Sequence, residues 1–203
     1  PSSRLVIKRA ENTSRSGSPD KAITWLEDWL RTHPKDVQVA EFLGISLQQA
    51  GKKARAIEIY NKVIMSDPDN AVALNNLAGL YLAEDRPEAL GLAERAWQVA
   101  KDNPGVQDTY GWALVRSGQI GRGLELLDQA LKVLPDIPEV RYHHAVALYR
   151  AGKKDAALES LRELLKRDVQ FEGRTDAERL IQEWQERAMS PRLLFSPYFI
   201  NEI

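Results

Sequence analysis

The sequence predicts an all-α fold built from repeated pairs of antiparallel helices. Aligned against itself, the 203-residue chain repeats with a period of 34 residues. Within each repeat, apolar residues recur at helical spacing in two stretches, and a glycine-containing turn separates the two stretches. Each repeat is therefore expected to fold as two helices that lie side by side.

Five copies of the repeat follow one another. In the clearest copy, Gly51 lies between the two helical stretches, Tyr60 lies in the second stretch and Pro68 follows it. A proline at this place ends the second helix because it cannot donate the next backbone hydrogen bond. The predicted units are about 3–36, 37–70, 71–103, 104–137 and 138–171, which together form an array over residues 1–171.

Small residues recur where the two helices of a pair must approach closely. A branched side chain has no room at such a contact. The first helices carry Gly44, Ala78, Gly111 and Ala145 at this position, and the second helices carry Ala56, Gly123 and Ala157.

Two further segments follow the array. Residues 172–188 are expected to form a capping helix, because their apolar residues fall on one stripe and their charges lie opposite. Residues 189–203 contain two prolines and are expected to be extended. The stripe of the capping helix consists of Ala177, Leu180, Ile181 and Trp184.

The extended tail is unusually apolar. Seven of residues 190–203 are Leu, Phe, Tyr or Ile, which indicates docking on an apolar surface of this array or of a neighbouring molecule. Packing over the capping helix and a disordered end are the alternatives. The expected docking residues are Leu194, Phe195, Tyr198 and Phe199.

These residues resemble the tetratricopeptide repeat family, whose units carry W-x2-L-G-x2-Y, then A-x3-F-x2-A, then P. The second unit matches with Leu43-Gly44, Ala56, Tyr60 and Pro68. The resemblance covers about residues 3–171. It implies a right-handed solenoid in which the first helix of each unit lines a concave face that binds partners.

On that resemblance, the ligand surface lies at the second, fifth, ninth and twelfth positions of the first helices. Along the array these positions change from polar to apolar and aromatic, and exposed aromatic residues in such a site indicate recognition. The alternative is that Trp112 and Tyr149 only pack between neighbouring units. The predicted groove residues are Asn75, Leu82, Asp108, Trp112, Val115, Arg116, Tyr142, Val146 and Tyr149.

Composition and charge exclude several classes of protein. The chain has 28 Lys and Arg against 29 Asp and Glu, and this balance argues against a nucleic-acid partner. It has no cysteine, which excludes disulfides and Cys-ligated zinc. No apolar run approaches the roughly 18 residues of a membrane span.

Catalytic residues are also lacking. The chain has three histidines, and no serine sits in a nucleophile turn beside one of them. His143 and His144 are adjacent on a helix and point to different sides, which suits a metal ion poorly. The sequence therefore predicts neither an enzyme nor a cofactor or metal site.

A narrower likeness concerns the middle units. Residues 74–81, 89–96 and 108–112 resemble bacterial envelope tetratricopeptide proteins of exopolysaccharide synthesis and export, including lipoproteins of exosortase (PEP-CTERM) systems. That likeness implies a periplasmic or envelope-associated role, with a cytoplasmic location as the alternative.

The expected function is a non-enzymatic scaffold that binds a partner peptide or protein segment in an apolar and aromatic groove. The alternative is a glycan-binding module, because the same aromatic residues could stack on sugar rings of a polysaccharide. Self-association through the tail is a further expectation.

Overall fold

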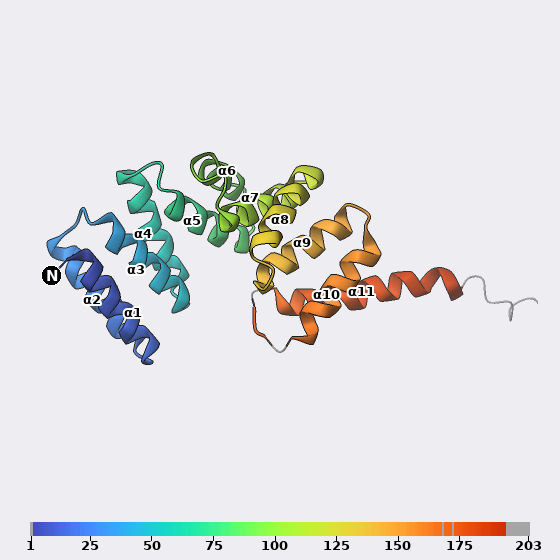
Figure 1. Ribbon diagram of the computed structural model, residues 1–203, viewed down its shortest axis with the longest axis horizontal. Helices are drawn as coiled ribbons and strands as arrows, with labels where there is room; N and C mark the ends of the chain where they lie inside the picture. Colours follow the sequence, from blue (N-terminus) through green and yellow to red (C-terminus); the bar gives the residue numbers. More distant parts are fainter. Residues whose placement is uncertain (1, 168, 172, 194–203) are drawn as a thin grey trace, which may run out of the picture. The chain divides into compact units, whose positions relative to one another are not determined.

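The computed structural model describes residues 2–167, 169–171 and 173–193, with side chains as far as Trp184. Within these residues every regular element is an α-helix, and the helices follow one another as short antiparallel pairs (Figure 1). The all-α fold predicted from the sequence is confirmed. The helices are α1 (Ser3–Arg15), α2 (Pro19–Thr32), α3 (Val37–Gln49), α4 (Lys53–Ser66), α5 (Ala71–Ala83), α6 (Ala89–Val99), α7 (Pro104–Arg116), α8 (Ile120–Val133), α9 (Pro138–Arg150), α10 (Lys154–Lys166) and α11 (Arg174–Leu193).

The turn inside a pair needs a residue in the left-handed region. Gly51, between α3 and α4, has φ +72°, a conformation that costs glycine nothing. Between α5 and α6 the residue with positive φ is Asp85, at 55°. Aspartate tolerates this region better than most residues, so the shorter third repeat can turn without glycine.

The chain divides into two compact units, Pro1–Ala113 and Leu114–Ile203, and the boundary falls within α7. In the first unit, successive helices from α1 to α6 contact one another. Fully buried side chains fill the space between them and supply most of the hydrophobic stabilisation. They include Leu26, Leu43, Leu47, Tyr60 and Leu77.

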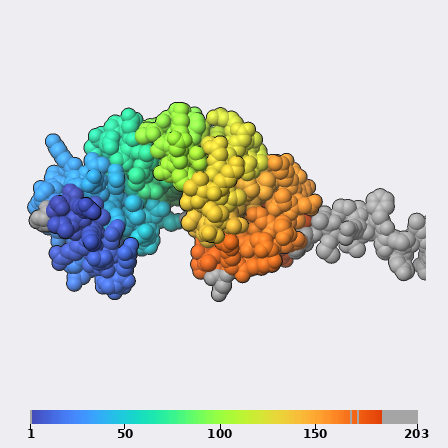
Figure 2. Space-filling view, in the orientation of Figure 1, coloured from blue at the N-terminus to red at the C-terminus, as the bar shows by residue number. Residues whose placement is uncertain are grey.

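In the second unit, α8 packs on α9, α9 on α10 and α10 on α11. Figure 2 shows the first turns of α11, in orange-red, lying directly against α10. Leu127, Leu161 and Leu164 are fully buried in this unit.

The last helix is longer than the sequence predicts. We expected the capping helix to end at residue 188 and an extended chain to follow, but α11 continues to Leu193. Ala188 and Met189 are strong helix formers, and the φ angle to which the ring restrains Pro191 is compatible with a helix. The predicted docking residues of the tail, from Leu194 to Phe199, lie outside the described residues.

First helices of successive repeats begin at similar caps. The side chain of Asp36 accepts a hydrogen bond from the backbone N–H of Val39, and that of Asn70 accepts one from Ala73. Each cap satisfies a donor that the first turn of the helix leaves free.

The helices α3 and α4 approach each other closely at Gly44. A Cβ atom added at Gly44 would lie 2.4 Å from Cε1 of Tyr60, whose side chain is fully buried. The aromatic ring therefore occupies the space that any other residue would need, as the repeat pattern predicts for this position.

Replacing Gly44→Ala should lower the free energy of unfolding by about 1–3 kcal/mol, because the new methyl group overlaps the Tyr60 ring. Gly91→Ala in α6 is the matched control, since no atom lies within 4 Å of its added Cβ. That change should raise the free energy of unfolding by roughly 0.5–1 kcal/mol through helix propensity. Urea denaturation measures both, and a shift of the same sign in the two variants would contradict the packing.

Candidate functional site

Nowhere in the described residues do three or more His, Cys, Asp or Glu side chains gather where they could bind a metal ion. His144 Nε2 lies 2.7 Å from Asp128 Oδ1, and the imidazole thereby links α9 to α8. No helix in the described part of the chain has the length and apolar character of a membrane span.

One stripe of α5 has open space beside it. The α5 stripe consists of Val72, Asn75, Gly79 and Leu82, which lie on one side of the helix at intervals of three and four residues. A Cβ atom added at Gly79 would have no neighbour within 4 Å. Val72 is 43% exposed and Leu82 is half-buried, so apolar surface lies on both sides of the glycine.

Asn75 contributes an unused polar group to this stripe. Its Oδ1 atom is buried and has no hydrogen-bond partner among the described residues. An unsatisfied buried acceptor costs about 1–3 kcal/mol. A half-turn of the carboxamide about its terminal bond exchanges the positions of the oxygen atom and the amide NH2 group, so the side chain can place either an acceptor or a donor at this position.

Two other predicted groove residues of the first unit are less accessible than expected. Asp108 and Trp112, both on α7, are buried, and Trp112 is only 9% exposed. We expected Trp112 to be an exposed aromatic residue of the groove, and the structure contradicts that exposure. Both side chains have interactions within the protein.

The predicted groove residues of the second unit are Val115, Arg116, Tyr142, Val146 and Tyr149. Val115, Tyr142 and Val146 are buried, which again contradicts the expected exposure. The end of α7 and α9 come together here, since Arg150 Nη1 donates a hydrogen bond to the carbonyl oxygen of Val115 at 3.0 Å.

Tyr142 is covered by the segment that leads into α11. A Cβ atom at Gly173 would lie 2.9 Å from Cε1 of the Tyr142 ring, so glycine is needed for this approach. The Tyr142 hydroxyl donates a hydrogen bond to the Asp176 carboxylate. Burial, reinforced by the charge of Asp176 and opposed by that of Arg116, raises the pKa of Tyr142 to about 12.

Tyr149 is covered by α11 itself. Its ring stacks on the Trp184 indole with centroids 3.6 Å apart and planes 3° from parallel. The alternative role, packing between neighbouring elements, therefore describes Tyr149 better than an open groove does. The sequence placed Trp184 on the apolar stripe of the last helix, but no short-range pattern indicated its partner.

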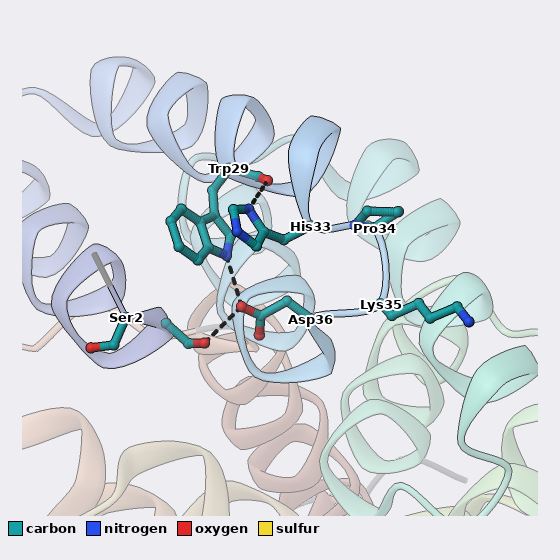
Figure 3. Close-up of a pocket in the computed structure, with 7 residues that line it drawn as sticks. Ser2, Trp29, His33, Pro34, Lys35 and Asp36 are labelled. Atoms are coloured by element: carbon teal, nitrogen blue, oxygen red, sulfur yellow. Dashed lines mark hydrogen bonds between the residues drawn. The ribbon is translucent and has the colours of Figure 1, made fainter.

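A pocket of about 520 Å³ lies in the first unit where α1, α2 and α3 meet. Figure 3 shows the rings of Trp29 and His33 face to face, with the indole nitrogen directed at the Asp36 carboxylate; the ring centroids are 3.7 Å apart. The lining residues are Ser2, Ser3, Trp29, His33, Pro34, Lys35 and Asp36.

The Asp36 carboxylate ties three helices together at this pocket. Its Oδ2 accepts hydrogen bonds from Trp29 Nε1 and Ser3 Oγ, each at 2.7 Å, while Oδ1 caps α3. Burial acts to raise the pKa of Asp36, but these hydrogen bonds together outweigh it and lower the pKa below its ordinary value. The period of the repeat reveals the cap, but it gives no sign of the contributions from Ser3 and Trp29.

Sequence comparison identifies the repeat. The family model described as "Tetratricopeptide repeat" matches residues 42–104 and 111–170, which together exceed half of the chain. The chain belongs to the tetratricopeptide repeat family. A tetratricopeptide repeat fold implies a protein–protein interaction scaffold, and proteins with this fold are generally non-enzymatic.

Relatives agree with this assignment. The chain is 29% identical over 121 residues, or 58% of its length, to TPR repeat-containing protein PA4667 of Pseudomonas aeruginosa. The matched segment spans 20% of the length of that protein.

Solved structures show the same tetratricopeptide fold. MamA of Desulfovibrio magneticus RS-1 superposes with a TM-score of 0.64 at 22% identity, over 81% of this chain and 93% of MamA. TTC0263, a thermophilic TPR protein of Thermus thermophilus, also superposes with a TM-score of 0.64, at 20% identity, over 91% of this chain and 99% of TTC0263. At these identities the likeness concerns the fold alone.

Replacing Asp36→Ala should lower the free energy of unfolding at pH 7 by about 1–2 kcal/mol, because α3 loses its cap. The pKa of Asp36 is lowered in the folded state, so its contribution is complete above the unfolded pKa of about 3.9 and is lost as the pH falls through the folded pKa. The difference between the wild type and the variant should therefore shrink below about pH 4. Urea titrations from pH 7 to pH 2.5 measure this, with the exposed Asp69→Ala as control; a difference independent of pH would contradict it.

Proposed function

We propose that this chain is a non-enzymatic scaffold that holds an extended segment of a partner protein against the α5 stripe. The observation that carries the proposal is the open space at Gly79 together with the Oδ1 atom of Asn75, which has no hydrogen-bond partner among the described residues, on the same side of one helix. Membership of the tetratricopeptide repeat family supports a protein partner, since α5 is the first helix of its repeat.

The chemistry of the stripe suits a peptide main chain. A glycine lets backbone approach closely. A carboxamide one turn away can donate to a carbonyl oxygen and accept from an N–H of the same peptide. Val72 and Leu82 are separated by ten residues, or about 15 Å along the helix, which an extended segment of about five residues spans.

Of the groove residues predicted from the sequence, the proposed site keeps two, Asn75 and Leu82, both on α5. Asp108, Trp112, Val115, Tyr142 and Val146 are buried, and Tyr149 is stacked on Trp184. Arg116 is exposed at the end of α7. It belongs to the second unit, whereas the α5 stripe belongs to the first.

The same burial weakens the glycan-binding alternative. Stacking on a sugar ring requires an open aromatic face. Trp112 and Tyr142 do not offer one, and Trp184 lies against a face of Tyr149. The exopolysaccharide context and the envelope location stay predictions from the sequence likeness, and the names of the relatives say nothing of either.

The experiment compares substitutions at Gly79 and Gly91, because an added Cβ atom meets no neighbouring side chain within 4 Å at either position. Twelve-residue peptides are selected from a random displayed library by the wild-type chain, and their affinity is measured by fluorescence anisotropy. Gly79→Leu should weaken binding at least tenfold, because the side chain fills the open space on the α5 stripe. Asn75→Ala should weaken it about fivefold, the effect of losing roughly 1 kcal/mol of hydrogen bonding.

Gly91→Leu is the matched control, since Gly91 is also helical and has no atom within 4 Å of an added Cβ, but lies on the second helix of the same pair. It should bind the selected peptides like the wild type. Equal affinities of the two glycine variants would refute binding at the α5 stripe.

A further inference from the structure

In the second unit, α11 contacts one side of α9, which is the first helix of its repeat. The α9 stripe consists of Tyr142, Val146 and Tyr149, which follow one another on one side of α9 at intervals of four and three residues. Two side chains of α11 contact the ends of this stripe. The Asp176 carboxylate accepts a hydrogen bond from Tyr142, and the Trp184 indole stacks on Tyr149.

The two helices match in register and direction. Tyr142 and Tyr149 are seven residues apart, and Asp176 and Trp184 are eight apart. At 1.5 Å per residue these separations are about 10 and 12 Å. A helix that lies parallel to α9 can therefore contact both ends of the α9 stripe. It needs a carboxylate opposite Tyr142 and, eight residues later, a tryptophan opposite Tyr149.

Few side chains of α11 are buried in this contact. Among those described, Ala177 and Trp184 are buried, Trp184 at 6% exposure, while the charged side chains from Glu178 to Glu183 are at least partly exposed. Leu180 and Ile181 are half-buried, so Trp184 is the most deeply buried large side chain in this part of α11, and interfaces often depend on one such aromatic anchor. Removing that anchor should free the stripe.

We propose that the α9 stripe is a helix-binding site whose built-in occupant is α11, and that it accepts a partner helix presenting a carboxylate and, eight residues later, a tryptophan. Such a partner competes with α11, which is tethered and therefore present at high effective concentration. Arg116 supplies a positive charge near Tyr142 that favours the partner carboxylate. The site belongs to the second unit and does not depend on the peptide site proposed at the α5 stripe.

The test uses the full chain and a fluorescein-labelled peptide with the sequence of residues 174–193. Trp184→Ala removes the anchor of the internal helix, so this variant should bind the peptide at least tenfold more tightly than the wild type does. A peptide that itself carries Trp184→Ala should bind at least tenfold more weakly than the unmodified peptide. Trp184→Leu, which keeps an apolar side chain, serves as the second variant if Trp184→Ala loses helical content by circular dichroism.

Two controls separate this site from other effects. Trp25→Ala removes a tryptophan in the first unit and should leave peptide binding at the wild-type level. The double variant Tyr149→Ala, Trp184→Ala should lose the gain in peptide affinity that Trp184→Ala alone produces. The double variant Gly79→Leu, Trp184→Ala should keep that gain. Equal binding by the wild type and Trp184→Ala, or a gain that survives Tyr149→Ala, would overturn the proposal.

Discussion

The close contact between the two helices of a pair is the constraint on which this structure depends. Gly44 leaves the space that the Tyr60 ring fills, and the buried ring then fixes how near α3 and α4 lie. Repeats of this kind contact mainly their neighbours, so the arrangement of one pair sets the position of the next. Caps such as Asp36 and Asn70 reinforce it by fixing where each first helix begins.

The same packing decides which first-helix side chains stay available for a partner. In the second unit, Tyr142 lies under the chain at Gly173 and Tyr149 lies under Trp184, so the aromatic residues stabilise the unit. On α5 the outcome differs because Gly79 has no side chain and no neighbour fills its place. The proposed recognition therefore depends on the glycine and the nearby Asn75 rather than on the aromatic residues of α7 and α9.

The helix pairs were predictable because a repeated pattern averages out local ambiguity, and the period located the turn at Gly51 and the close contact at Gly44. The exposure of the groove side chains was not predictable, because it depends on elements that are distant in the sequence. Trp184 covers Tyr149 from 35 residues away, and Asp36 receives a hydrogen bond from Ser3, 33 residues earlier. The end of the last helix was missed because a proline near a helix terminus removes only one hydrogen bond.

The central claim is that the α5 stripe is open and the α9 stripe is covered. Hydroxyl-radical footprinting of the full chain, read by mass spectrometry, compares the two directly. Met65, at 84% exposure, is the reactive reference and the fully buried Tyr60 the protected one. Leu82 should be modified and Tyr142 should be as protected as Tyr60, despite the higher intrinsic reactivity of tyrosine. Rapid modification of Tyr142 together with protection of Leu82 would contradict the account.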